Sequence, residues 1–261
     1  MFGKRKRGKA PTGRKRGKRK PLRMGSIVKR LLMVAFFVWA GWEFVCYSSE
    51  VLAVSTIGIQ GAVTIDEKAI VDACAITTAD NLFLLDVEAA RQRVLGMPHV
   101  KACRITRIFP DRVVISVSER HPEATVLIDN RAYEIDGECV VLRQLSLSDV
   151  HTGPYITNVP GLASVAPGGQ LDSRALLEAL AVWRAFSGIS MARDVVVSEI
   201  AAVKHNDIRM YCDELPFEIR WGRGGYETQA LRLDLLWNAK GKELPFDEYV
   251  DLRYGQDLAC K

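Results

Sequence analysis

Short runs in which apolar and polar residues alternate begin after residue 53, and each run predicts a β-strand. The first run, residues 54–60, places Ile57 and Ile59 on one face and ends at Gly61. Two further runs, 100–107 and 113–118, flank a Phe-Pro-Asp-Arg turn and therefore predict a hairpin.

Two short amphipathic helices are predicted between the first strand and this hairpin. The first is expected to begin with a capping box, in which Thr64 caps the helix and Glu67 stands three residues later. Asp86 is the expected cap of the second helix, which Gly96 and Pro98 stop. The predicted order is therefore strand, helix, helix, strand, strand.

The region from residue 125 onward predicts a mixed or antiparallel sheet with two helices, and the whole chain an α+β fold. One helix contains Leu176 and Leu180 and is stopped by Gly188. The other contains Leu231 and ends at Gly241. Strand patterns occupy residues 126–133, 195–203, 208–212, 217–221 and about 250–258.

A continuous apolar segment, residues 31–47, precedes all these elements. As a helix it would be about 26 Å long, close to the hydrocarbon thickness of about 30 Å. Lys29 and Arg30 can extend their charged ends to the interface, and Trp39, Trp42 and Tyr47 suit an aromatic belt. We therefore expect a membrane helix over residues 31–50, in which the role of Glu43 stays open.

The charge distribution gives this helix an orientation. Residues 1–30 hold 14 Lys and Arg and no acidic residue, whereas the remainder holds 22 basic and 31 acidic residues. By the positive-inside rule, the N-terminus lies in the cytoplasm and the body outside it. A cleaved signal peptide is the alternative, because Val51 and Ala53 resemble a cleavage site. No aromatic residue beyond Phe2 interleaves the basic leader, which argues against nucleic-acid binding.

The spacing of cysteine and histidine argues against a local metal site. The closest two of the six cysteines, Cys46 and Cys74, are 28 residues apart. Most cysteines are expected to be small buried residues, and a disulfide between Cys74 and Cys103 stays open. We also find no P-loop, GxSxG or HExxH motif. The glycine-rich residues 222–225 predict a strand-to-helix loop, so we expect no enzyme, no catalytic residue and no cofactor.

The strand and helix order after a single anchor resembles a POTRA domain, and several strings make the chain resemble the FtsQ/DivIB family of bacterial cell-division proteins. The strings are Ile57-Gly58-Ile59-Gln60-Gly61, Asn81-Leu82-Phe83, Pro98-His99-Val100, Arg107-Ile108-Phe109-Pro110, Glu119-Arg120-His121-Pro122-Glu123-Ala124 and Tyr249-Val250-Asp251-Leu252-Arg253-Tyr254. The resemblance implies a basic cytoplasmic tail (1–30), a transmembrane helix (31–50), a POTRA domain (51–124) and a C-terminal β domain (125–261).

The resemblance also implies a non-enzymatic scaffold of the divisome at the septum, with partners of the FtsB and FtsL type. In the family, the last strand and the preceding helix bind these coiled-coil proteins. The implied partner-binding residues are Val250, Asp251, Leu252, Arg253 and Tyr254. Arg253 would offer a bidentate guanidinium to a partner carboxylate, and Tyr254 a flat apolar face.

Three alternatives remain open at this point. Tyr254 can instead be a core residue, with Arg253 a solvated strand residue. The chain can be a POTRA-containing export or outer-membrane assembly factor, although no repeat of the unit and no barrel strands are visible. It can also be a secreted wall-modifying enzyme with a long signal peptide. Weak self-association stays open as well.

Overall fold

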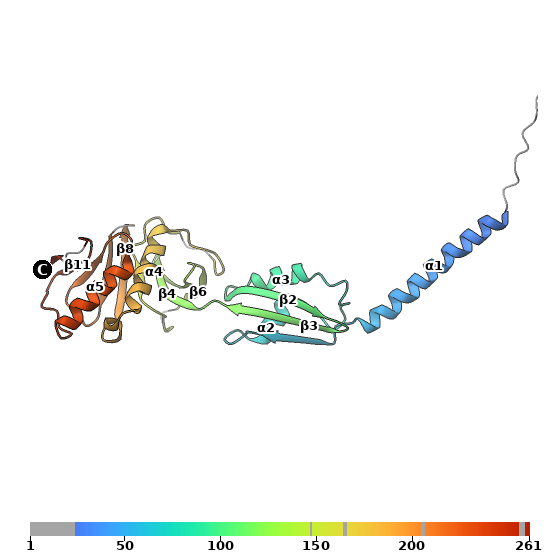
Figure 1. The fold of residues 1–261 in the computed structure, drawn as a ribbon, viewed down its shortest axis with the longest axis horizontal. Coiled ribbons are helices and arrows are strands. Elements are labelled where there is room, and N and C mark those ends of the chain that lie inside the picture. Colours follow the sequence, from blue (N-terminus) through green and yellow to red (C-terminus); the bar gives the residue numbers. More distant parts are fainter. Residues whose placement is uncertain (1–23, 147, 164–165, 205–206, 256–258) are drawn as a thin grey trace, which may run out of the picture. The chain divides into compact units, whose positions relative to one another are not determined.

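The computed structural model describes residues 24–146, 148–163, 166–204, 207–255 and 259–261, and the chain divides into two units, residues 1–51 and 52–261. The first unit contains helix α1 (Met24–Val51) (Figure 1). Among the described residues, no helix has the length and hydropathy of a membrane span. The membrane helix over residues 31–50 therefore stays a prediction, and most of the basic tail lies outside the described residues.

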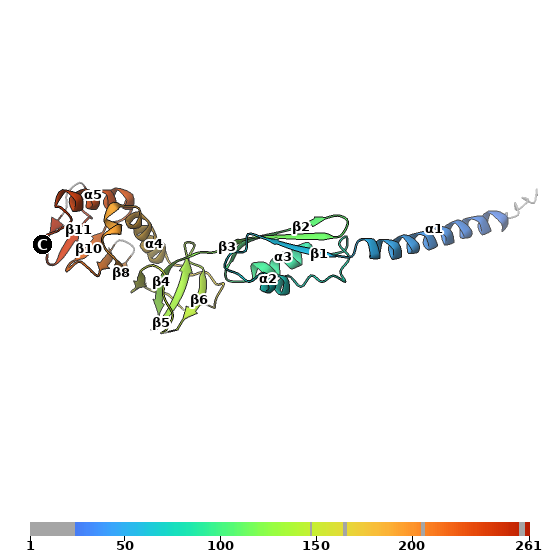
Figure 2. The same cartoon turned by 90° about the horizontal axis from the view of Figure 1, so that it is seen from below.

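The second unit begins with a small module of three strands and two helices (Figures 1 and 2). In its sheet, β3 lies between β1, which is parallel to it, and β2, which is antiparallel. The predicted strand-helix-helix-strand-strand order is confirmed. The elements are β1 (Thr56–Gln60), α2 (Glu67–Cys74), α3 (Val87–Leu95), β2 (Val100–Ile108) and β3 (Arg112–Glu119).

The two helices of this module begin at aspartate caps. Asp86 accepts a hydrogen bond from the Ala89 N–H at 2.9 Å, as predicted. The prediction for α2 is wrong, because Asp66 rather than Thr64 is its cap. The Thr64 N–H donates instead to the carboxylate of Glu119, at the far end of β3. A partner 55 residues away along the chain therefore overrides the local capping signal.

The core of the small module lies between the two helices and one face of the sheet. Its cysteines, Cys74 and Cys103, are both buried and free, so they pack as small apolar residues. The buried residues are Val54, Ile70, Cys74, Ile76, Leu82, Ala90, Val94, Val100, Cys103, Ile105, Val113, Ile115 and Val117.

The rest of the unit is built on a second sheet with nine described strands, in the order β12-β11-β10-β9-β8-β7-β4-β5-β6. The predicted mixed sheet with two helices is confirmed. The strands are β4 (Pro122–Ile128), β5 (Arg131–Asp136), β6 (Val141–Leu145), β7 (Tyr155–Thr157), β8 (Val197–Lys204), β9 (Asp207–Cys212), β10 (Glu218–Trp221), β11 (Tyr249–Asp251) and β12 (Ala259–Cys260). The helices are α4 (Arg174–Ser187), a short 3-10 helix η1 (Ser190–Arg193) and α5 (Tyr226–Ala239).

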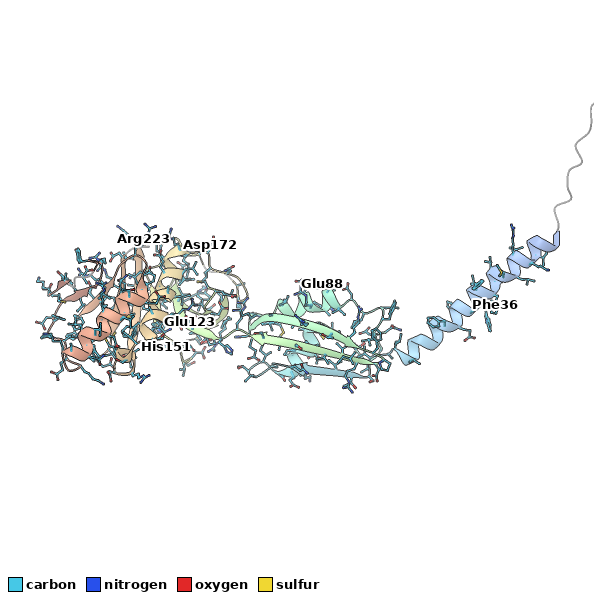
Figure 3. All side chains as sticks on the ribbon, viewed as in Figure 1. Phe36, Glu88, Glu123, His151, Asp172 and Arg223 are labelled. Atoms are coloured by element: carbon cyan, nitrogen blue, oxygen red, sulfur yellow. The ribbon has the colours of Figure 1, made fainter. Side chains whose placement is uncertain are left out.

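Three parallel junctions join parts of this sheet that are distant in sequence. Strand β7 is parallel to both β4 and β8, and β11 is parallel to β10. Helix α4 lies between β7 and β8 in sequence, and α5 between β10 and β11, which is the usual way to connect parallel strands. Arg184 of α4 also donates two hydrogen bonds to Glu123, which ties this helix to β4. Figure 3 labels Glu123 among the side chains of the molecule.

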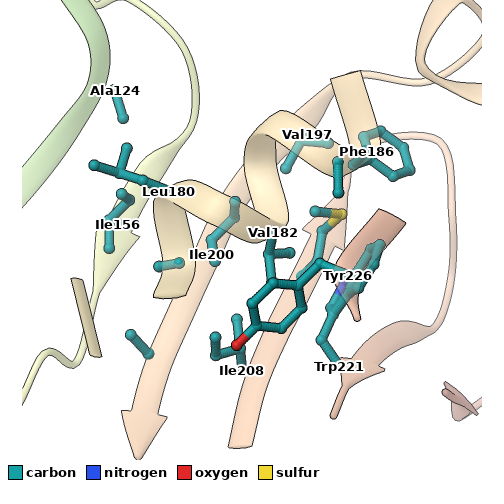
Figure 4. Packing of buried hydrophobic residues seen from close by; sticks show 14 of the residues in the cluster. Ala124, Ile156, Leu180, Val182, Phe186, Val197, Ile200, Ile208, Trp221 and Tyr226 are labelled. Carbon is teal, nitrogen blue, oxygen red and sulfur yellow. The ribbon is translucent and has the colours of Figure 1, made fainter. Parts of the chain in front are cut away.

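Both helices pack against the same face of the sheet and form its core (Figure 4). Phe186 of α4, Ile200 of β8 and Trp221 of β10 are fully buried there. Along β9, the buried Ile208 and Met210 alternate with side chains on the opposite face. We call the helix-free side of this sheet the open face.

The end of the chain departs from the single strand predicted over residues 250–258. Strand β11 stops at Asp251, and β12 returns antiparallel to it. The N–H groups of Glu248 and Tyr249 donate to the Lys261 carbonyl, which extends this pairing. Strand β12, and not β11, is therefore the outermost described strand of the sheet.

Candidate partner-binding surface

The five residues that the sequence singles out near the end of the chain fall into a buried and an exposed group. Val250, Asp251 and Leu252 are at most 1% exposed, because β11 is paired on both sides and its inner face meets the core. Arg253 and Tyr254 are exposed. Only these last two side chains are accessible to a partner.

The guanidinium of Arg253 is already engaged within the chain. Its Nε lies 2.9 and 3.0 Å from the two carboxylate oxygens of Asp251, and one terminal nitrogen lies 2.5 Å from Oδ2. Burial alone would raise the pKa of the Asp251 carboxyl, but the hydrogen bonds from Arg253 outweigh it and lower that pKa. The family resemblance predicts that the Arg253 guanidinium binds a carboxylate of a partner. In the structure it instead binds the buried carboxylate of Asp251, two residues earlier in the chain.

Tyr254 has the opposite character and is 59% exposed. Helix α5 lies beside it, because one terminal nitrogen of Arg232 donates to the Leu252 carbonyl at 2.9 Å and the other bonds the Gly255 carbonyl. On the outer side of α5, Leu231 and Leu235 are 58% and 70% exposed. We call Leu231, Leu235 and Tyr254 the C-terminal apolar patch.

The two leucines were assigned to the helix but not to the site by sequence reasoning. They stand four residues apart, so they lie on one side of a helix. That spacing alone indicates a core face, and the buried residues Ala230 and Leu233 of α5 show where the core face lies. The sequence did contain one sign of exposed apolar residues on this helix: α5 has more apolar positions than a single buried stripe can hold.

The open face of the large sheet carries a ladder of charged side chains. Arg209 of β9 pairs with Asp207 and Glu218, and Arg220 of β10 pairs with Glu218. The Tyr211 hydroxyl donates to Glu218 at 2.8 Å, and the Arg220 guanidinium lies 4.0 Å from the ring centre of Tyr249. Burial raises the pKa of Glu218, but these donors outweigh it and lower the pKa. The ladder is satisfied internally.

The string that begins at Glu119 forms a second cluster of charges, at the junction of the two sheets. The Glu119 carboxylate accepts hydrogen bonds from the N–H groups of Val63, Thr64 and Ile65 at 2.7 to 3.0 Å. Burial opposes ionisation of this carboxyl, but the three donors prevail and lower its pKa to about 2. Gly61 begins this loop with a φ of +84°, and a Cβ there would collide with the Val117 carbonyl.

Arg120 continues the junction into the large sheet. One terminal nitrogen lies 2.5 Å from Asp136 of β5 and 2.9 Å from Glu138. Lys101 of β2 also binds Glu138, at 2.8 Å. Glu119 therefore binds the loop after β1 in the small module, and its neighbour Arg120 binds the turn after β5 in the large sheet.

The described residues contain no group of three or more metal-ligating side chains. The glycine-rich loop before α5 is organised by Gln229, which accepts from the Gly222 N–H at 2.8 Å and donates to the Gly224 carbonyl. The polar groups of this loop therefore bond one another at the start of the helix.

Comparison with known proteins finds similar proteins of one kind. Residues 52–120 match the family described as POTRA domain, FtsQ-type. The cell division protein FtsQ of Syntrophotalea carbinolica is 26% identical over 230 residues, which cover 88% of this chain and 80% of that protein. FtsQ of Myxococcus fulvus is 27% identical and covers 77% and 70%, and FtsQ of Geobacter sp. strain M21 is 23% identical and covers 93% and 91%. These comparisons support the FtsQ/DivIB family for this chain.

The POTRA match corresponds to the small module of the second unit. The match ends at Arg120, one residue after β3 and two residues before β4. The small module is therefore the POTRA domain, and the Glu119-Arg120 pair stands at its boundary. The names of the relatives support a role in bacterial cell division.

Proposed function

We propose that this FtsQ/DivIB-family protein is a non-enzymatic, membrane-anchored scaffold that acts at the division septum. Residues 1–30 lie in the cytoplasm, residues 31–50 cross the cytoplasmic membrane, and residues 51–261 extend outside it as a POTRA domain and a C-terminal β domain. The apolar side chains of α1 and the basic leader support the anchor and its orientation. The family match supports the role in division.

The C-terminal apolar patch is the observation that carries the proposed scaffold role. Large apolar side chains exposed together on a folded surface mark an interaction site. Strand β12 stands next to β11 and is unpaired on its outer side within the described part of the sheet. A partner can add a strand to β12 and lay an apolar helix face on the patch.

The partner that fits this surface is a divisome protein of the FtsB type, together with an FtsL-type protein. Both would be anchored in the same membrane and reach the β domain through a coiled-coil segment. By binding these partners, the scaffold would bridge them to other division proteins. The relatives reported above bear cell-division names, so they give no support to the export-factor alternative.

The test is crosslinking of the full-length protein at its native level in its own host, followed by identification of the proteins that copurify. We would compare Tyr254→Lys and Leu231→Glu/Leu235→Glu with Val150→Lys, which changes an 85% exposed apolar residue elsewhere. Small coiled-coil division proteins should copurify with the wild type and with Val150→Lys, and be lost in the two patch variants.

Two outcomes would contradict this proposal. Undiminished copurification of division proteins with both patch variants would remove the patch from the interface. Copurification of export or outer-membrane components instead would overturn the scaffold role. We avoid Arg253→Glu in this test, because it would place a second carboxylate beside the buried Asp251 and disturb the fold.

A further inference from the structure

Two loops of the POTRA domain lie beside the segment through which the chain enters it. The N–H of Leu82 donates to the Leu52 carbonyl at 2.7 Å, which brings the α2–α3 loop to this segment. The N–H of Ser55 donates to the Asp111 carbonyl at 2.8 Å, which brings the β2–β3 turn to its other side. Figures 1 and 2 show this turn at the end of the domain where residue 52 enters. We call this end the entry tip.

The entry tip exposes four large apolar side chains. Phe83 and Leu84 of the α2–α3 loop are 66% and 78% exposed, and Ile108 and Phe109 of the β2–β3 turn are 45% and 56% exposed. Aromatic and aliphatic groups gathered on loop tips of a small domain are costly in water. Phe83, Ile108 and Phe109 belong to two of the strings named above, and the side chains of all four residues lie outside the POTRA core.

The entry tip carries side chains of both signs. The carboxylate of Asp80 accepts two hydrogen bonds from Thr77, and that of Asp111 accepts one from the Ser55 hydroxyl, so both remain charged. Arg107 donates to the Leu85 carbonyl, and within the described residues neither Arg107 nor Arg112 has a carboxylate partner. Both arginines flank the turn that carries Ile108 and Phe109, so they can reach lipid phosphates where these two side chains insert.

Chain connectivity limits how far this tip can lie from the proposed membrane helix. That helix ends at residue 50, and Leu52 is at most about 7 Å further along an extended chain. The polar layer on each side of the hydrocarbon is about 5 to 8 Å thick. Since Leu82 is bonded to Leu52, the loop that carries Phe83 begins within reach of the lipid headgroups.

We propose that the entry tip docks into the outer interface of the lipid bilayer, with Phe83, Leu84, Ile108 and Phe109 inserted among the headgroups and Arg107 and Arg112 on the phosphates. This inference rests on the proposed membrane anchor. A single helix leaves a domain free to tilt, whereas a second contact at the interface holds the POTRA domain in one orientation on the membrane.

The test is site-specific photocrosslinking of the full-length protein in vesicles of phosphatidylethanolamine and phosphatidylglycerol. A benzophenone amino acid would replace Phe83 or Phe109 in the entry tip, and Phe37 of α1 as a probe of the anchor. The matched control is Val63, which is 89% exposed but follows β1 at the opposite end of the POTRA domain. Lipid adducts would be identified by the mass of the labelled peptide.

The inference expects lipid adducts at positions 37, 83 and 109 and only background at position 63. Adducts at position 37 alone would overturn the docking of the tip and leave the anchor in place. Crosslinks from positions 83 and 109 to protein in place of lipid would also overturn it, because they would show a protein partner on the tip. Absence of adducts at position 37 would overturn the anchor, and the inference with it.

Discussion

The two sheets of this protein each bury one face and leave the other open, and their open faces differ. On the large sheet, Arg209, Glu218 and Arg220 form a cross-strand ladder of ion pairs. On the small sheet, the outward positions of the central strand are Val114 and Ser116, and Gly58 is the neighbour of Val114 on β1. Ion pairs on the open face help to stabilise the large sheet in addition to its core. The open face of the small sheet has no such ladder among its described residues.

The two open faces differ because each sheet keeps its register in a different way. The large sheet is assembled through three parallel junctions between distant segments, and cross-strand ion pairs help to specify which residues meet. The small sheet has one tight hairpin, and Glu119 secures its remaining loop from within. We therefore expect substitutions and solution conditions to affect the two modules separately.

The largest effect should come from the core of the large sheet. Replacing the fully buried Phe186 with Ala removes an aromatic ring between α4 and the sheet and should cost about 3–5 kcal/mol of stability. Trp183, Trp221 and Trp237 all belong to this module, and the POTRA domain has no tryptophan. Urea unfolding followed by tryptophan fluorescence should shift strongly, while the POTRA part of the circular dichroism signal stays. An equal shift of both would mean that the modules unfold together.

Glu119→Ala should give the next largest effect, now in the POTRA domain. It removes the acceptor of three backbone N–H groups and should cost about 2–3 kcal/mol. The folded-state pKa of about 2 is below the usual 4.5, so this contribution is present above pH 4.5 and is lost as the pH falls toward 2. Urea midpoints by circular dichroism at pH 7 and pH 3 measure this. Glu119→Gln is the shape-matched control and should recover part of the loss.

Arg253→Ala should destabilise the end of the large sheet by about 1–3 kcal/mol, because it leaves the buried Asp251 carboxylate without its guanidinium. The pKa of Asp251 is lowered in the wild type, so this part of the stability is lost as the pH falls. Hydrogen exchange of the β11 amides reports the local change. If Arg253→Lys and Arg253→Ala leave exchange unchanged, the pair has no structural role.

The smallest effect should come from salt. The ladder on the open face is partly exposed, so 1 M salt should weaken the large sheet by less than about 1 kcal/mol. The POTRA sheet has no such ladder among its described residues and should not respond in the same direction. Thermal unfolding followed by both tryptophan fluorescence and circular dichroism compares the salt responses of the two modules in one sample. Equal salt responses of the two modules would show that the ladder does not stabilise the large sheet.

The POTRA elements could be predicted because their signals are local. The alternation around Ile57 and Ile59, the Asp86 cap and the hairpin turn all depend on neighbours within a few residues. The cap of α2 could not be predicted, since the Thr64 N–H is claimed by Glu119 from another strand. In the candidate site, Tyr254 is exposed, as its predicted interface role requires, and that role stays a prediction. The family string does not include Leu231 and Leu235.

The order of strands and helices, the apolar segment with its basic leader and the resemblance to FtsQ/DivIB proteins could all be read from consecutive residues, because periodicity, charge and short strings are local properties. The ion pair of Arg253 with Asp251, the pairing of β12 with β11, and the hydrogen bonds of Arg232 in α5 to the carbonyls of Leu252 and Gly255 come from the fold. These outcomes depend on which distant segments become neighbours, and that is determined by burial of the whole core and not by any local pattern.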